Sequence, residues 1–293
     1  MKKLLVISGK GGTGKTTVSS SIIHELHVPS FADCDVDAPN LHILHRFSED
    51  PVRSDFIGGS KAIVTEESCI GCGICKDLCR FDAIKIENGK SKVIDISCEG
   101  CGVCEYACPV NAISMKPDVA GNLDLYKSSN DFEEITFSTA ELKMGRGNSG
   151  KLVSKVKENL FDSISDDSFV VLDGSPGVGC PVMASLTGVD LALVVTEPTL
   201  SGMSDLERIL KSISLSCTKA AVCVNKFDVN IEMTDKIKSF CAKAGVPFVG
   251  EIPYDKNASK AINQGKSVIE TDGPASTALK KLTQNISSLM EEI

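Results

Sequence analysis

The sequence predicts an α/β protein with a parallel sheet, interrupted by one inserted small α+β domain. Short apolar runs alternate with helical stretches over most of the chain, a rhythm typical of parallel strands covered by helices on both faces. Eight of the 13 cysteines lie between Cys69 and Cys108, where the composition changes. We therefore expect one discontinuous α/β domain, residues 1–59 and 119–293, and an inserted domain, residues 60–118.

The composition favours a well-packed protein that binds neither nucleic acid nor membrane. Hydrophobic residues make up 42% of the chain, and the formal net charge is −8. Non-specific nucleic-acid binding depends on basic patches, and no apolar run is long enough to span a bilayer. Thirteen cysteines, an odd number, in a chain of 293 residues favour metal ligands or reactive thiols over a disulfide scaffold. We therefore expect a cytoplasmic protein.

The elements follow in order from the apolar pattern. Leu4–Ser8 is expected to be a strand, followed by a glycine-rich loop and a helix over residues 16–26. Residues 119–147 give no clear pattern. Further strands are expected at 30–33, 169–173, 191–195, 221–224 and 247–250, and helices at 151–161, 203–213, 232–244 and after Pro274.

The glycine-rich loop fits the phosphate-binding pattern G-x-x-x-x-G-K-[ST] in its required setting between a strand and a helix. Its glycines allow a tight turn that points backbone N–H groups at phosphate oxygens, and the helix N-terminus adds a favourable dipole. Lys15 would reach the β- and γ-phosphates, and Thr16 would ligate Mg²⁺. The expected nucleotide-binding residues are Gly9, Lys10, Gly11, Gly12, Thr13, Gly14, Lys15, Thr16 and Thr17.

Lys10 is not required by that pattern, and with it the segment Gly9–Thr17 resembles the deviant phosphate loop of the MinD/ParA/Mrp ATPases and the nitrogenase iron protein. The resemblance implies that Lys10 contacts phosphate across a homodimer that forms around ATP. Asp33–Leu41 is similar to the first switch of that family, and Asp173–Gly177 to the second switch, which is usually written D-x-P-P-G. Ser175 departs from that second pattern.

The same resemblance assigns roles to the carboxylates. It implies that Asp35 positions the attacking water and that Asp33 and Asp173 support Mg²⁺. Lys10, Lys15 and Asp35 are then the catalytic residues. A carboxylate at the end of a strand can also serve as a simple helix cap or loop residue.

Asn225-Lys226-Phe227-Asp228 follows an apolar strand and has two interpretations. It matches the guanine-recognition motif of GTPases, whereas the resemblance to MinD-type proteins implies that Asn225 contacts adenine. In those proteins a later segment similar to Ile252–Asp255 assists, which adds Pro253 and Asp255 to the nucleotide site. We expect ATP.

Eight cysteines form two copies of one motif. Cys69–Cys75 recurs 29 residues later as Cys98–Cys104, and each copy has a fourth cysteine, Cys79 or Cys108. The x₂, x₂, x₃ spacing is typical of bacterial ferredoxins with two [4Fe–4S] clusters, in which the fourth cysteine ligates the other cluster. Zinc is the competing interpretation, because paired C-x₂-C also binds zinc. We expect cluster one on Cys69, Cys72, Cys75 and Cys108, and cluster two on Cys98, Cys101, Cys104 and Cys79.

Nearly the whole chain thus resembles a MinD-superfamily P-loop ATPase with an inserted ferredoxin domain. The resemblance implies a Mg²⁺-dependent ATPase that dimerises on binding ATP and couples ATP to electron transfer with a redox partner protein. A non-redox carrier or assembly factor that delivers metal clusters to a client protein is the alternative. A MinD-like spatial organiser is a weaker alternative, because the acidic C-terminal end lacks the basic amphipathic helix that binds membranes.

The remaining cysteines divide into two groups. Cys217, Cys223 and Cys241 lie in apolar surroundings and are expected to be small core residues. Cys180 follows the second-switch Asp173 by seven residues, so we expect a thiol whose accessibility changes when the switch moves.

Overall fold

The computed structural model describes residues 1–45, 47, 49–129, 134–165 and 168–293. Within them the chain forms two compact units. The first comprises Met1–Arg53, Leu123–Glu141 and Ser149–Ile293, and the second comprises Ser54–Asn122 and Leu142–Asn148.

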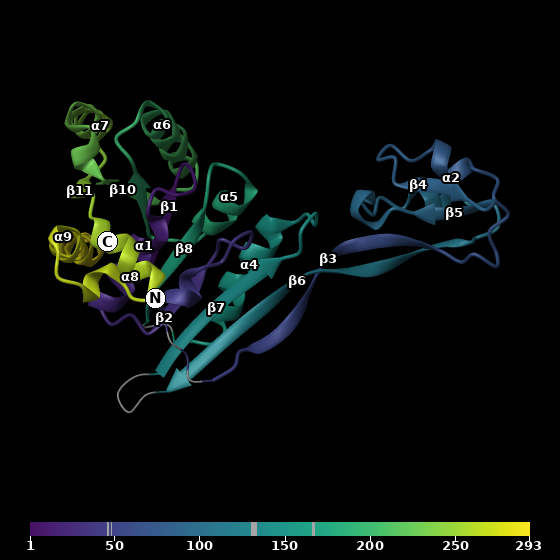
Figure 1. The fold of residues 1–293 in the computed structure, drawn as a ribbon, viewed down its shortest axis with the longest axis horizontal. Coiled ribbons are helices and arrows are strands. Elements are labelled where there is room, and N and C mark those ends of the chain that lie inside the picture. The colour runs from purple at the N-terminus through teal and green to yellow at the C-terminus, as the bar shows by residue number, and fades with distance from the viewer. Residues whose placement is uncertain (46, 48, 130–133, 166–167) are drawn as a thin grey trace. The chain divides into compact units, whose positions relative to one another are not determined.

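A nine-stranded sheet runs through the described residues in the order β11-β10-β9-β1-β8-β2-β7-β6-β3. The pairs of β1 with β8 and β9, of β2 with β8 and β7, and of β10 with β9 and β11 are parallel, and all of these strands except β9 are labelled in Figure 1. The predicted parallel α/β sheet is therefore confirmed. Its strands are β1 (Lys2–Ser8), β2 (Ser30–Asp33), β3 (Val52–Val64), β6 (Ile113–Ser129), β7 (Glu134–Leu142), β8 (Phe169–Pro176), β9 (Leu191–Thr196), β10 (Lys219–Asn225) and β11 (Phe248–Ile252).

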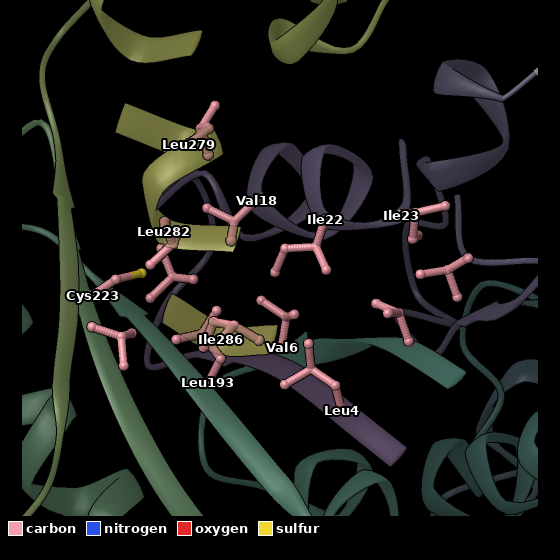
Figure 2. Packing of buried hydrophobic residues seen from close by; sticks show 14 of the residues in the cluster. Leu4, Val6, Val18, Ile22, Ile23, Leu193, Cys223, Leu279, Leu282 and Ile286 are labelled. Atoms are coloured by element: carbon pink, nitrogen blue, oxygen red, sulfur yellow. The ribbon is translucent and has the colours of Figure 1, made fainter. Parts of the chain in front are cut away.

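Helices α1 and α9 cover the central strands of the first unit. Figure 2 shows Val18 and Ile22 of α1 packed toward Val6 of β1, with Leu282 and Ile286 of α9 beside them, and all five side chains are almost completely buried. The helices of this unit are α1 (Lys15–Glu25), α4 (Ser149–Phe161), α5 (Cys180–Leu186), α6 (Leu200–Ser214), α7 (Ile231–Ala244), α8 (Lys256–Asn263) and α9 (Pro274–Glu291).

The second unit is built around the two cysteine motifs. Two short helices, α2 (Ile74–Asp77) and α3 (Val103–Tyr106), occupy equivalent places in the two copies, and β4 (Ile84–Glu87) pairs antiparallel with β5 (Lys90–Val93). Its small core contains cysteines as well as aliphatic side chains. The buried members are Ala62, Cys75, Ala83, Ile84, Cys98 and Ile113.

Several elements differ from the prediction. The unassigned residues 119–147 contain β7 and the second half of β6, and helix α8 was not expected. Cys223 and Cys241 are buried as predicted, but Cys217 is exposed and has a left-handed φ of 56°, because it lies in the turn after α6 rather than in the core. No helix in the described part of the chain is long and apolar enough to cross a membrane.

Candidate nucleotide and cysteine sites

The phosphate loop connects β1 to α1 at the carboxyl end of the sheet. Gly14, the residue before α1, has a φ of 88°, a conformation that L side chains rarely adopt. A side chain at Gly14 would overlap the amide nitrogen of Asn225, and one at Gly9 would overlap the Cβ of Asp205. Glycine is thus required at both positions for close approach. The N-terminus of α1 faces the loop with free N–H groups, which suits a phosphate.

Lys15 lies in a cluster of carboxylates. Its side chain is buried, and Nζ is 2.8 Å from Oδ1 of Asp173 and 4.0 Å from Oδ2 of Asp35. Burial disfavours the ammonium, but the attraction of the surrounding carboxylates outweighs it and raises the pKa of Lys15. The residue is therefore a fixed positive charge beneath the phosphate loop.

Asp173 at the end of β8 is fully buried and only partly satisfied. Its Oδ1 accepts hydrogen bonds from Lys15 and from the hydroxyl of Ser19, the latter at 2.7 Å. Its Oδ2 is buried and has no hydrogen-bond partner among the described residues. Leaving a buried carboxylate oxygen without a hydrogen bond costs free energy. Such an oxygen is the kind of ligand that Mg²⁺ and its bound waters require. The donor set therefore fits a magnesium ion beside the phosphate loop.

Asp33 at the end of β2 organises the loop that follows it. Oδ1 accepts the N–H of Asp35 at 3.0 Å, and Oδ2 accepts those of Asn40 and Leu41 at 2.8 and 2.9 Å. Burial and the nearby Asp173 raise the pKa of Asp33 to about 7. Its assignment to the metal stays a prediction, since the contacts observed here are all to the backbone.

Asp35 lines a cavity together with the phosphate loop. Burial raises its pKa to about 6, against the lowering effect of Lys15. A carboxylate that lines the cavity and has a pKa this close to neutral pH can accept a hydrogen bond from a water molecule. The cavity is lined by Ser8, Gly11, Gly12, Gly14, Lys15, Thr16, Thr17, Asp35, Asn40, Ile43, Leu44, Pro176 and Ile262.

The departure at Ser175 from the D-x-P-P-G pattern has a local explanation. The hydroxyl of Ser175 donates a 2.6 Å hydrogen bond to the carbonyl of Cys34, which directly follows β2. This bond ties the segment predicted to be the second switch to the beginning of the segment predicted to be the first.

Lys10 pairs with a carboxylate that the sequence did not single out. Its Nζ is 3.5 Å from Oε2 of Glu197 and 3.3 Å from the hydroxyl of Ser201. The other carboxylate oxygen of Glu197 is 2.6 Å from Nζ of Lys226. Glu197 therefore holds two lysines of its own chain, and the predicted contact of Lys10 across a dimer stays a prediction.

The predicted base-binding residues line a second cavity next to the phosphate loop, and they include Asn225, Pro253 and Asp255. The amide of Asn225 donates to the carbonyl of Thr13 at 2.8 Å, so this side chain also braces the loop. Oδ1 of Asp255 caps α8 through Asn257, while its Oδ2 is buried without a partner among the described residues. Tyr254, which lies in the predicted segment Ile252–Asp255 but was not assigned to the site, also lines this cavity and is 51% exposed.

The four cysteines predicted for cluster two lie around one cavity of the second unit. Cys79 comes from the first motif, and Cys98, Cys101 and Cys104 come from the second. The N–H of Ala83 donates to the sulfur of Cys79 at 3.4 Å. This donor set, four thiols around an otherwise apolar hollow, fits an iron–sulfur cluster.

The cysteines predicted for cluster one show related contacts. The N–H of Ala112 donates to the sulfur of Cys108 at 3.2 Å, and the N–H of Ser91 donates to that of Cys69 at 3.5 Å. Hydrogen bonding from Ser91 lowers the pKa of the Cys69 thiol. Across the described residues, no three or more His, Cys, Asp or Glu side chains form a group that could hold a single metal ion. The assignment of clusters to these cysteines therefore stays a prediction.

The chain is similar to known proteins in sequence and in fold. A family model described as the CobQ/CobB/MinD/ParA nucleotide binding domain matches residues 4–268. An uncharacterized protein of Methanocaldococcus jannaschii is 31% identical over 288 residues, which cover 97% of this chain and 96% of that protein.

Two further proteins, a cluster carrier and a MinD, are similar to this chain in sequence or in fold. An iron-sulfur cluster carrier protein of Pyrococcus horikoshii is 26% identical over 161 residues, which cover 49% of this chain and 54% of the carrier. The structure of the septum site-determining protein MinD of Pyrococcus horikoshii, in complex with Mg-ADP, superposes with a TM-score of 0.58 at 17% identity. The alignment covers 98% of this chain and 96% of that one, and at this identity it shows a common fold.

Proposed function

This chain belongs to the CobQ/CobB/MinD/ParA nucleotide-binding family, and we propose that it is a Mg²⁺-dependent ATPase whose nucleotide-bound homodimer carries two [4Fe–4S] clusters per chain for electron transfer. The observation that carries the proposal is the cavity surrounded by Cys79, Cys98, Cys101 and Cys104, in a chain that also contains a complete phosphate loop. The residues around each site support distinct steps.

In the nucleotide site the chain supplies charge and position. Lys15 is held by Asp173 at 2.8 Å and would exchange this partner for the β- and γ-phosphate oxygens. Magnesium, when bound, neutralises charge on those phosphates. Thr16 and the unpartnered oxygen of Asp173 would hold the ion, directly or through its waters. Asp35 would orient the attacking water in the shared cavity.

Dimerisation would complete this site. The proposed role of Lys10 is to contact phosphate in the partner subunit, which requires it to leave Glu197. The side chain of Lys10 is 36% exposed, and its Nζ contacts the exposed Ser201 and the half-buried Glu197, so the movement breaks partly exposed contacts.

In the second unit the chain would hold its clusters as resident cofactors. Four thiolates from one chain surround the cavity, and they come from both motifs, so release would have to separate contacts from two parts of the fold. Iron–sulfur clusters, when bound, take up and pass on single electrons. The N–H donors of Ala83 and Ala112 would stabilise the thiolates of Cys79 and Cys108. These features favour electron transfer over delivery of a cluster.

Cluster delivery remains the second candidate because of one specific observation. The chain is similar over about half the length of an iron-sulfur cluster carrier protein of Pyrococcus horikoshii. Cys72 and Cys101 are also exposed, so a client protein could approach a cluster at either motif. The common fold with MinD structures supports the organiser function only through the ATPase domain.

Anaerobic purification tests the proposal. We expect about eight irons and about eight acid-labile sulfides per chain, together with Mg²⁺-dependent ATP hydrolysis that Lys15→Ala abolishes. Incubation with an excess of apo-ferredoxin then distinguishes the two candidates, because resident clusters stay with the chain and a delivered cluster transfers. A preparation that contains zinc and no labile sulfide would contradict both.

A further inference from the structure

The two cysteine motifs are related by matched hydrogen bonds, so their surroundings can be compared position by position. The N–H of Thr65 donates to the carbonyl of Ala112 at 2.8 Å, and the N–H of Ile94 donates to that of Ala83 at 2.7 Å. Both the donors and the acceptors differ by 29 residues, which is the spacing of the motifs themselves. The structural duplication therefore extends beyond the cysteines.

Charge and backbone donors are also matched at the two predicted cluster sites. The ammonium of Lys90 donates to the carbonyl of Cys69, and that of Lys61, 29 residues earlier, donates to the carbonyl of Cys98. The N–H groups of Ala83 and Ala112 donate to the fourth cysteine of each motif at 3.4 and 3.2 Å. Because these contacts occur at both predicted cluster sites, they give no difference between the surroundings of the two clusters.

One buried position breaks this symmetry. Ser91 is 4% exposed, and its hydroxyl lies 3.2 Å from the sulfur of Cys75, a ligand predicted for cluster one. The equivalent position in the other half is Ala62, which is 5% exposed and lines the cavity predicted for cluster two. A serine hydroxyl can donate to a thiolate, whereas the alanine methyl group cannot.

We propose that Ser91 makes the predicted cluster one the more easily reduced of the two, a proposal that rests on the proposed presence of both clusters. One-electron reduction adds negative charge that the ligand sulfurs share, with no bond made or broken. A hydrogen bond to a sulfur stabilises that added charge and so raises the reduction potential. The hydroxyl of Ser91 supplies such a bond to Cys75, and Ala62 supplies none to its counterpart Cys104.

Reciprocal substitution tests this difference in the anaerobically purified holoprotein, with dithionite as reductant and electron paramagnetic resonance as the readout. Ser91→Ala should lower the higher of two midpoint potentials and leave the lower one unchanged. Ala62→Ser should raise the lower one and leave the higher one unchanged. Ser91→Thr, which keeps a hydroxyl, should retain the wild-type potentials. Ser114→Ala, which removes an exposed hydroxyl from the same unit, is the matched control and should change neither potential.

The outcomes separate this inference from the function on which it rests. If each variant retains about eight irons and neither swap shifts its own midpoint potential, the role of Ser91 is wrong and the proposed function stands. A shift of both midpoints by Ser91→Ala would also overturn it, because the hydroxyl contacts a ligand of one site only. If the wild-type protein holds no iron–sulfur cluster, both proposals fail.

Discussion

Removing the carboxylate of Glu197 is expected to strengthen ATP-dependent dimerisation. Its Oε2 lies 3.5 Å from Nζ of Lys10, and its Oε1 lies 2.6 Å from Nζ of Lys226. In the proposed dimer Lys10 must leave this pair to reach phosphate in the partner subunit. Glu197→Gln keeps the size of the side chain and removes the charge that holds Lys10 in the single chain.

The magnitude follows from the exposure of the pair. The side chain of Lys10 is 36% exposed and that of Glu197 is 16% exposed, so the pair contributes about 0.5 kcal/mol, in the range of partly exposed ion pairs. A symmetric dimer releases two such pairs, about 1 kcal/mol in all. The dissociation constant of the ATP-bound dimer should therefore fall about fivefold.

Sedimentation in the presence of Mg²⁺ and a non-hydrolysable ATP analogue measures this constant. Glu207→Gln, which removes one exposed carboxylate from α6, controls for the change in net charge. In the background of Lys10→Ala, the Glu197→Gln substitution should have no further effect, because the contact that it releases is already absent. An unchanged or weaker dimer for Glu197→Gln alone would refute the reasoning.

Four further outcomes are expected. Lys10→Ala should keep nucleotide affinity within severalfold and greatly lower hydrolysis and dimerisation, and unchanged turnover would exclude a role across the dimer. Cys79→Ser should remove the resonance signal of the second cluster and spare the first, since Cys79 lines the cavity of the second motif; loss of the first signal instead would reverse the assignment. The exposed thiol of Cys180 should be alkylated at a different rate when ATP is bound, and equal rates would remove it from the switch. Burial lowers the pKa of His45 to about 4, so its protonation should cost stability as pH falls from about 6.5 to about 4; urea unfolding of His45→Asn should show a flatter pH dependence over that range, and an equal slope would exclude this residue.

The central strands could be predicted from the sequence, and the strands at one edge could not. Leu4, Val171 and Leu193 belong to continuous apolar runs that identify a buried parallel strand. Strand β7 places Thr136, Ser138 and Thr139 at its buried centre, so its pattern does not stand out as apolar. Strand β3 contains Gly58 and Gly59, which weaken a local strand signal. Each of these strands also pairs with a strand that is distant in sequence, β7 with β2 and β3 with β6.

Within the candidate sites, sequence motifs identified the residues expected to bind phosphate and metal. They did not identify the neighbouring residues that position those side chains. Gly14 and Lys15 are identified by spacing alone. Glu197 has no motif, and it meets Lys10 only because the loops after β1 and β9 lie at the same edge of adjacent strands. Asp33 could have been assigned its backbone role, because an aspartate that begins a loop commonly accepts nearby N–H groups. The buried Ser91 becomes meaningful only when the two motifs are superposed.

Crossed hydrogen bonds join the two repeats of the second unit. Thr65 of one repeat bonds to Ala112 of the other, and Ile94 bonds back to Ala83. A polypeptide with one repeat would leave these backbone groups to water, and a second copy of itself could supply the same partners. Two copies of a one-repeat polypeptide could therefore associate as a symmetric pair. With both repeats in one chain, an association that would depend on concentration becomes folding within a single molecule.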